Sequence, residues 1–468
     1  MSKNQQLSLL PSVDFLLNRN QVQELFDRFS RDLVKEKCRL VLDEVRQNIL
    51  SGTPPPALSR EEMAKEMLAK VAVLLQQDFA PSLKTVINAT GVILHTGLGR
   101  APLSQAAQEN VGRILRGYSS LEIDLETGKR GERTDHVSRL LCKLTGAEAA
   151  LVVNNNAAAV FLSLNTLAFA REAIISRGQL VEIGGAFRMP DVMDKSGCIM
   201  HEIGTTNKTK IADYENAVSE NTGVVVVAHT SNYRVLGFTA EVELKELAEL
   251  THKHNLPLMH DLGAGAVVDL QKFGLPYEPL VQDSIAAGAD VVTFSGDKVL
   301  GGPQSGIIVG KKEWIERIHK NPIMRAVRCD KTTYAALEAT LKLFFNEKHL
   351  LEKHKTFRLL TESVATIEAR AKELYNKIEP HIFQKFDVAI KDSFAQTGSG
   401  ALPLEKIPSK AMTFRAKNAG LEKFAAHLRH ADPPVMGYIK NEEFCLDLRT
   451  VDDEEVKKLA KAVNSYKL

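Results

Sequence analysis

The sequence has few cysteines and no excess of charge of either sign. Its five cysteines, spread over 468 residues, include no C-x-x-C pair and no spacing typical of a metal site. This excludes a disulfide-stapled scaffold and a cysteine-based zinc site, and reduced thiols are expected. The 60 basic residues nearly balance the 58 acidic ones, for a net charge of +2. Any nucleic-acid-binding surface must therefore be local.

Long apolar runs are absent as well. No stretch of about 18 apolar residues occurs, so no membrane-spanning helix and no membrane partner are expected. Pro11 and Asp14 interrupt the apolar residues near the N-terminus, a pattern that does not fit a signal peptide. A cytoplasmic protein is the resulting expectation. The length and the 44% hydrophobic content are ordinary for a globular chain of about two to four domains.

The first part of the chain predicts a small helical domain. Gly52-Thr-Pro-Pro-Pro56 follows its apolar periodicity as a stiff linker. Ser59 and Glu62 then match a capping box that opens a further helix. We interpret 1–58 as a helical domain and 59–84 as a linker helix. From the residues alone, a packing role in an oligomer fits this block as well as a binding role.

Residues 85–330 predict an α/β domain. Short apolar runs alternate with helical patterns, which favours a mostly parallel sheet covered on both faces. After residue 330 the pattern changes, and 331–468 predicts a smaller α+β domain. The strand-like runs are 151–153, 173–176, 180–183, 198–203, 224–228, 256–260, 291–294 and 307–309, then 411–414, 435–439 and 444–448.

A glycine-rich loop after one of these strands carries the most informative lysine. The strand 291–294 breaks at Ser295-Gly296, and Lys298 precedes Gly301 and Gly302. Missing side chains let a flat ligand approach the backbone, and a desolvated lysine has a depressed pKa and can condense with an aldehyde. These are the requirements of a pyridoxal-phosphate lysine. A solvated loop lysine is the alternative, and the loop alone does not decide between them.

Other strand ends add groups that such a cofactor needs. Asn155, Asn156 and Ala157 open a helix after the run 151–153, and free N–H groups at a helix N-terminus can hold a phosphate. Simple capping by the asparagines is the alternative. Asp261 ends the run 256–260 and could pair with the ring nitrogen of the cofactor.

A third strand end carries His229 and Asn232, which could reach the phenolic oxygen of the cofactor. A core histidine is an equally good reading of His229. The order along the chain is phosphate turn, His/Asn strand end, Asp261 and then Lys298, 298 − 261 = 37 positions later. This is the order found in aminotransferase-like, fold type I pyridoxal-phosphate enzymes.

Longer motifs make the resemblance specific, and they run through the whole chain. It resembles the bacterial L-seryl-tRNA(Sec) selenium transferases, the selenocysteine synthases. The motifs that carry the resemblance are Asn88-Ala-Thr-Gly-Val-Ile-Leu-His-Thr-Gly-Leu-Gly-Arg100, Val153-Asn-Asn-Asn-Ala-Ala-Ala159, Gly204-Thr-Thr-Asn207, His229-Thr-Ser-Asn-Tyr233 and Ser295-Gly-Asp-Lys-Val-Leu-Gly-Gly-Pro-Gln304.

The resemblance implies a reaction on serine esterified to tRNA(Sec). Water would be eliminated to give aminoacrylyl-tRNA, and selenophosphate would add selenium to give selenocysteinyl-tRNA. Lys298 would move the Cα proton, Asp297 would assist the leaving hydroxide or hold the lysine, and Ser295 would join the cofactor residues. Arg100, Arg325 and Arg328 match the family's site for the selenophosphate anion. Arg325 and Arg328 would share one face if their segment is helical.

The resemblance also implies partners. Residues 1–58 would recognise the tRNA by its shape and backbone. The chain would assemble as a homo-oligomer, a decameric ring made of five dimers, so that an arginine could act in a neighbour's site. Arg130 and Arg133 would serve the tRNA or merely the surface.

Two other readings compete with this one. A cysteine or selenocysteine desulfurase on the same fold would need a nucleophilic cysteine facing the cofactor, and Cys329 is the candidate nearest the proposed site. A catalytically silent tRNA-binding scaffold would not need Lys298 and Asp261, so the presence of both argues against it.

Overall fold

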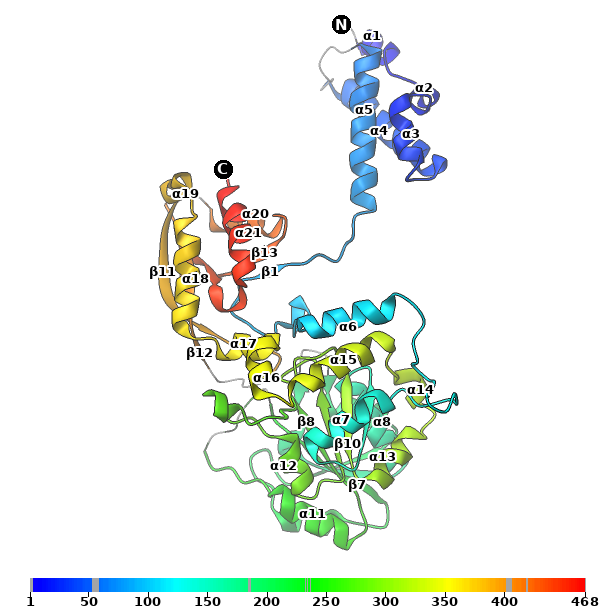
Figure 1. The fold of residues 1–468 in the computed structure, drawn as a ribbon, viewed down its shortest axis with the longest axis vertical. Coiled ribbons are helices and arrows are strands. Elements are labelled where there is room, and N and C mark those ends of the chain that lie inside the picture. Colours follow the sequence, from blue (N-terminus) through cyan, green and yellow to red (C-terminus); the bar gives the residue numbers. More distant parts are fainter. Residues whose placement is uncertain are drawn as a thin grey trace. The chain divides into compact units, whose positions relative to one another are not determined.

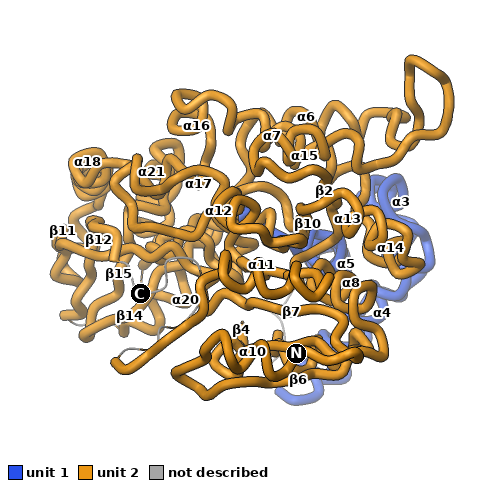
Figure 2. Tube along the Cα trace, turned by 90° about the horizontal axis from the view of Figure 1, so that it is seen from below, with its two compact units in different colours: residues 1–85 blue, residues 86–468 orange. Residues whose placement is uncertain are grey.

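The computed structural model describes residues 3–52, 59–183, 187–231, 233, 235, 237–400, 406–417 and 420–467. The chain forms two compact units, residues 1–85 and 86–468 (Figure 2). The predicted linker at residues 53–56 and the predicted cofactor residue Asn232 lie outside the described residues.

The first unit is helical, as the apolar periodicity predicted. The predicted capping box is present, since Ser59 Oγ accepts from the Glu62 N–H and Glu62 reaches back to the Ser59 N–H. Val41, Val71 and Leu75 are fully buried in one cluster shared by the last two helices of the unit. The helices are α1 (Lys3–Ser8), α2 (Val13–Leu17), α3 (Asn20–Phe26), α4 (Arg31–Ser51) and α5 (Arg60–Asp78).

The segment 59–84 packs into the core of the first unit. The sequence predicted a linker helix there, whereas α5 contributes Met67, Leu68, Val71 and Leu75 to the core of the first unit. An amphipathic helix buries its apolar stripe wherever a partner offers one, and α4 does so here. The compact unit therefore runs to Thr85, beyond the expected end of the helical domain.

The second unit is built on a seven-stranded sheet with the order β2-β10-β9-β8-β7-β3-β6. Its strands β7, β8 and β10 are labelled in Figure 1. Neighbouring strands are parallel except for β10, which runs antiparallel to β2 and β9. This confirms the mostly parallel sheet. The strands are β2 (Ala149–Val153), β3 (Glu172–Ser176), β6 (Ile199–Ile203), β7 (Thr222–Ala228), β8 (Leu258–Gly263), β9 (Val291–Ser295) and β10 (Gly306–Gly310).

Both faces of the sheet are buried, which explains why its strands read as continuous apolar runs. Leu151 and Val153 of β2 pack with Ile308 of β10 on one face, while Val152 and Ile307 pack on the other. The first face is covered by α8 (Asn156–Ala168), α9 (Met189–Lys195) and α13 (Lys312–His319). The second face is covered by α7 (Asp135–Thr145), α10 (Ile211–Ala217), α11 (Leu244–Lys253), α12 (Val281–Ala286) and α15 (Lys331–Leu343).

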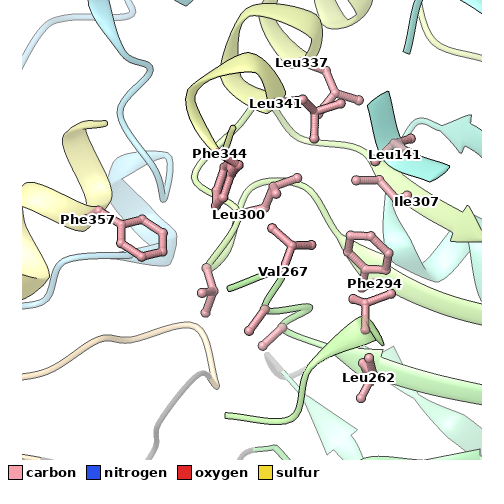
Figure 3. Packing of buried hydrophobic residues seen from close by; sticks show 14 of the residues in the cluster. Leu141, Leu262, Val267, Phe294, Leu300, Ile307, Leu337, Leu341, Phe344 and Phe357 are labelled. Atoms are coloured by element: carbon pink, nitrogen blue, oxygen red, sulfur yellow. The ribbon is translucent and has the colours of Figure 1, made fainter. Parts of the chain in front are cut away.

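The core on the second face fixes the segment that carries Lys298. Phe294 precedes that segment and Leu300 lies within it, and both are buried in the same cluster as Leu337 and Leu341 of α15 (Figure 3). The loop between β9 and β10 is thus anchored on both sides of the lysine.

The C-terminal part of the second unit has its own sheet, of order β11-β12-β15-β14, and its own apolar cluster. The α+β pattern predicted for this part is confirmed. Its strands are β11 (Phe386–Ala395), β12 (Ile407–Ala416), β14 (Tyr438–Lys440) and β15 (Glu443–Asp447), while β13 (Val435–Met436) pairs with β1 (Ile87–Asn88). Its helices are α18 (Val364–Asn376), α19 (Pro380–Lys385), α20 (Leu421–Arg429) and α21 (Asp453–Asn464).

The remaining elements connect these layers. They are α6 (Gln105–Leu115), α14 (Met324–Val327), α16 (Glu347–Lys353), α17 (Lys355–Thr361) and the short helices η1 (Thr96–Leu98), η2 (Arg177–Gln179), η3 (Leu270–Phe273) and η4 (Leu448–Thr450). Among the described residues, no helix combines the length and the apolar character needed to cross a membrane.

One predicted strand does not belong to the main sheet. The run 180–183 was expected to join the main sheet, but only Glu182–Ile183 (β4) is extended, and it pairs with Phe187–Arg188 (β5) in a separate hairpin. Leu180 instead ends the short helix η2. A short apolar run does not by itself say which sheet it enters.

Candidate active site

Three strand ends meet at one edge of the main sheet. The parallel strands β7, β8 and β9 lie side by side, so their carboxyl ends bring His229, Asp261 and the loop after Ser295 to the same edge. Ligands of open α/β sheets bind at this edge. The structure therefore brings together the groups that the sequence placed at separate strand ends.

Lys298 is buried at this edge, with only 6% of its surface exposed. A β-carbon placed on Gly263 would lie 3.8 Å from Lys298 Nζ, which is ordinary contact distance and places the amine beside the end of β8. Burial lowers the pKa of the Lys298 amine, although nearby Asp261 opposes the effect. A lowered pKa makes the neutral, nucleophilic amine more accessible.

The glycines of the Lys298 loop are required by its tight path. A β-carbon on Gly296 would lie 2.1 Å from Ser305 Oγ, and one on Gly301, at φ 63°, would lie 2.2 Å from the His354 ring. The Gly301 N–H donates to the Lys298 carbonyl over 2.8 Å. The loop is therefore a closed turn that holds the lysine in one place.

Asp261 is the buried carboxylate of the site, at 7% exposure. Its Oδ1 accepts from Asn156 Nδ2 (2.8 Å), Thr293 Oγ1 (2.9 Å) and the Gly263 N–H (3.3 Å). None of these hydrogen bonds uses Oδ2. Burial raises the pKa of the Asp261 carboxyl, and the bonds from Asn156 and Thr293 offset part of the rise. A cation placed at Oδ2 would stabilise the charged carboxylate.

The N-terminus of α8 lies against this carboxylate. Asn155 caps the helix, because its side chain accepts from the Ala158 N–H over 2.8 Å. Capping, the alternative weighed from the sequence, is thus what its side chain does here. The Asn156 amide orients Asp261, and its Oδ1 is buried without a hydrogen-bond partner. The N–H groups of Asn156 and Ala157, which precede the capped N–H of Ala158, have no partner within the helix and can hold a phosphate.

His229 and Ser295 lie at the expected strand ends. The His229 N–H donates to the Asp261 carbonyl over 2.8 Å. Burial lowers the pKa of His260 to about 3, and the charge of the nearby His229 ring lowers it further in the same direction. Ser295 is buried as the last residue of β9. A cofactor contact by either residue stays a prediction.

Two site residues were missed by the sequence reasoning. Ser231 is 3% exposed, its Oγ is buried without a partner, and a β-carbon on Gly263 would lie 3.6 Å from it. The buried Glu278 is near enough to favour the charged form of Lys298. Ser231 stands in the motif 229–233, so its position gave a signal, whereas nothing near Glu278 in the sequence pointed to this site.

These residues fit pyridoxal phosphate. The unused Oδ2 of Asp261 suits a protonated ring nitrogen, the start of α8 suits the phosphate, and Lys298 suits the aldehyde. The unpartnered Asn156 Oδ1 and Ser231 Oγ are polar atoms that a bound polar group would satisfy.

Asp297 and Arg100 form an ion pair beside the lysine. Arg100 Nη1 lies 2.8 Å from Asp297 Oδ2, and the Asp297 side chain is 8% exposed. Arg100 has φ 63°, a left-handed conformation that a non-glycine residue rarely adopts. Such strain at a site is held by its surroundings, here by this ion pair and by the Arg100 N–H donated to the His95 carbonyl.

Arg325 and Arg328 line a different cavity, of about 360 Å³, together with Arg130 and Arg133. The condition for a shared helix face is not met, because α14 ends at Val327 and Arg328 is extended. Arg328 instead bridges Val153, the last residue of β2. Within the described residues of one chain, Arg100 lies beside Asp297 and is not among the residues that line this cavity.

Cys329 does not have the properties of a nucleophile. It is 4% exposed, and burial raises the pKa of its thiol to about 12. A thiol in that state is almost entirely protonated at neutral pH. The desulfurase alternative is therefore not favoured.

Comparisons with known proteins agree with this geometry. The family described as L-seryl-tRNA selenium transferase matches residues 86–452, and the one described as selenocysteine synthase N terminal matches residues 7–46. A solved structure of D-glucosaminate-6-phosphate ammonia-lyase covers 83% of this chain and 97% of its own at 18% identity, with a TM-score of 0.57. The chain has the aminotransferase-like, fold type I architecture of pyridoxal-phosphate enzymes.

Proteins named L-seryl-tRNA(Sec) selenium transferase are similar over nearly the whole length. The one from Carboxydothermus hydrogenoformans is 47% identical, covering 97% of both chains. That from Alkaliphilus oremlandii is 46% identical, covering 99% of both. That from Haemophilus influenzae is 46% identical, covering 95% of this chain and 96% of its own. With these relatives and the match over residues 86–452, the chain belongs to the L-seryl-tRNA selenium transferase family.

Proposed function

We propose that the chain converts L-seryl-tRNA(Sec) to L-selenocysteinyl-tRNA(Sec), with selenophosphate as the selenium donor. The observation that carries the proposal is the buried pair of Lys298 and Asp261 at one sheet edge, in a chain of this family. The reaction is the loss of water from the seryl group, followed by addition of selenium at Cβ.

Bound pyridoxal phosphate supplies an electron sink for the charge that develops at Cα of the seryl group. Asp261 would hold the ring nitrogen in its protonated form, and Asn156 and Thr293 keep this carboxylate in place. The N–H groups at the start of α8 would hold the phosphate. Lys298, whose pKa is lowered by burial, removes the proton from Cα with its Nζ.

Asp297 and Arg100 act next to the lysine. Asp297, next to Lys298 in the chain, would assist the departing hydroxide or hold the lysine, and Arg100 orients it through the 2.8 Å ion pair. Arg100 also supplies a cation at the end of the site where the donor must meet Cβ. Burial of Asp297 keeps water away from this step.

The donor anion is bound by arginines. Selenophosphate is a compact oxyanion, and planar guanidinium groups bind such anions through paired N–H donors. Arg325 and Arg328 line the cavity of about 360 Å³ and would provide such a site, while Arg100 would act from its position beside Asp297.

The first unit binds the tRNA. Residues 7–46 match the family's N-terminal description. Residues 1–70 carry 11 basic and 10 acidic side chains, a net charge of 11 − 10 = +1. Recognition therefore rests on shape more than on a polycationic surface, with a modest salt dependence.

The chain acts as a homo-oligomer, a decameric ring of five dimers. Large apolar side chains gather in the segment 115–125, where Leu115, Tyr118, Ile123 and Leu125 are all more than half exposed. Contiguous exposed apolar residues favour an interface. A neighbour's arginines can then complete the donor site of each chain.

The two half-reactions provide the test of this proposal. Arg325→Ala or Arg328→Ala should still consume seryl-tRNA, because loss of water needs no second anion. Donor use should weaken by about tenfold to a hundredfold, since a charge-assisted hydrogen bond contributes about 1.5–3 kcal/mol. The measurement is the conversion of serylated tRNA to selenocysteinyl-tRNA at a series of donor concentrations, and the expected change is in the donor concentration that gives half-maximal conversion.

Arg317→Ala is the matched control, because Arg317 lies exposed on α13, stacked over Trp314 and outside the cavity. Unchanged donor use in the Arg325 and Arg328 variants would show that they lie on a solvated face. Loss of seryl-tRNA binding itself would assign them to the tRNA phosphates.

Asp261→Asn should retain the cofactor and slow removal of the Cα proton. The amide keeps the size of the side chain but cannot stabilise a protonated ring nitrogen, so the electron sink is weaker. Exchange of the Cα hydrogen of seryl-tRNA into solvent is the measurement. Wild-type exchange rates in this variant would remove Asp261 from the proposed chemistry.

A further inference from the structure

Glu122 occupies the arginine-lined cavity from within. Its Oε1 lies 2.7 Å from Arg133 Nε and 3.7 Å from Arg328 Nη1, and its Oε2 lies 2.9 Å from Arg130 Nη2. The same cavity is also lined by Glu132, His319 and Arg325. A carboxylate among three guanidinium groups takes the place that a bound oxyanion would take.

The contacts of Glu122 differ in strength. Arg133 is fixed, because its Nη1 also donates to the Cys329 carbonyl over 2.7 Å. Its bond to Glu122 is the main reason that the pKa of the Glu122 carboxyl is lowered. The 3.7 Å separation from Arg328 is longer than a hydrogen bond and is easily given up. Arg325, in the described part of the chain, forms no ion pair.

We propose that Glu122 is an internal counter-anion of the donor site, which competes with phosphate-type anions for Arg133 and Arg328. The inference rests on the proposed function, which assigns Arg325 and Arg328 to selenophosphate. A guanidinium N–H that points at Glu122 cannot at the same time donate to a ligand oxygen. The carboxylate is 27% exposed, so it can turn to solvent when an anion enters.

This competition has a consequence for affinity. Removing the charge of Glu122 raises the positive potential felt at Arg328 and frees the N–H donors that Arg130 and Arg133 direct at Glu122. Donor and inorganic phosphate, which share the phosphate group, should then both bind more tightly. Because Glu122 is partly exposed, the gain is about threefold to fivefold.

The test compares two glutamates of one cavity. Glu122→Gln removes the charge next to the arginines, while Glu132→Gln removes the same charge from a residue whose ion pair is with His319 at 3.7 Å. Inorganic phosphate is the probe, measured as an inhibitor of selenophosphate-dependent product formation by the full chain with its cofactor. Glu122→Gln should lower the inhibition constant of phosphate and the donor KM by about threefold to fivefold. The seryl-tRNA KM should not change, and Glu132→Gln should leave all three constants near wild type.

Glu122→Ala should shift the constants in the same direction, because the charge and not the shape of the side chain competes. A rise in both constants in the Gln and Ala variants would overturn the inference, since Glu122 would then hold the arginines in their binding positions. An equal effect of Glu132→Gln would also overturn the inference, because the change would then come from the total charge of the cavity and not from Glu122 in particular. A changed seryl-tRNA KM with an unchanged phosphate constant would assign the cavity to RNA phosphates, which also overturns it.

Failure of the inference and failure of the proposed donor site are distinguishable. If Arg325→Ala weakens donor use while Glu122→Gln changes nothing, only the competition by Glu122 is refuted. If Arg325→Ala also changes nothing, the cavity is not the donor site and both fail.

Discussion

Replacing Lys298 by alanine is expected to abolish turnover while the chain stays folded. The structure places the Lys298 amine beside Gly263 and Asp261 at the edge of the sheet. The variant removes both the attachment point of the cofactor and the group that moves the Cα proton. Borohydride reduction followed by peptide mass spectrometry should find a pyridoxyl group on the Lys298 peptide of the wild type and none in the variant.

Two further variants sharpen this prediction. Lys298→Arg keeps a long cationic side chain, but a guanidinium is not deprotonated at neutral pH, so it should be inactive as well. Lys272→Ala, at an exposed lysine of η3, is the matched control and should behave as wild type. A pyridoxyl group found on another lysine of the wild type would place the cofactor elsewhere and refute the assignment.

The sequence predicted the main sheet well because its strands are buried on both faces. Val224–Ala228 and Val291–Phe294 read as unbroken apolar runs for that reason. The strand β11 (Phe386–Ala395) was missed, since Lys391 and Asp392 are exposed and only its two end residues are fully buried. A half-exposed edge strand has no comparable signal.

The site was predictable where strand ends determine position, and not where tertiary contacts do. Lys298 and Asp261 followed from the strand pattern and converge as expected. The approach of Ser231 and Glu278 depends on loops that return to the same edge, which no local pattern encodes. Arg325 and Arg328 were expected to share a face only if their segment is helical, and that condition is not met because the backbone of Arg328 bridges Val153 of β2, a contact between distant segments.

The roles of these residues remain predictions even where their positions agree. Asn156 was expected to help hold a phosphate, and the structure adds a hydrogen bond from its amide to Asp261. Arg100 was expected to bind the donor, and it lies in an ion pair with Asp297 instead of beside the other arginines. Asn156 therefore connects the start of α8 with Asp261, and Arg100 connects the expected donor site with Asp297. Variants of either residue should affect both of the groups that it connects.

Deleting residues 1–85 should abolish productive binding of seryl-tRNA and spare the cofactor site. The first unit ends at Thr85 and the transferase family match begins at residue 86, so the cut falls at a boundary of packing and of homology alike. Every group placed at the cofactor site belongs to the second unit. The truncated chain should retain the pyridoxyl group on Lys298 after reduction, while its affinity for seryl-tRNA, measured by filter binding, falls beyond detection.

The position of the cut is itself informative. A chain that begins at residue 59, the boundary first predicted from the sequence, would keep α5 without its partners α2 to α4. Met67, Leu68, Val71 and Leu75, all buried in the complete unit, would then face solvent as an apolar stripe. Such a stripe favours aggregation, so this chain should be less soluble than the one that begins at residue 86. If the chain of residues 86–468 bound seryl-tRNA as tightly as the full chain, the first unit would have another role, and the second unit would hold the tRNA alone.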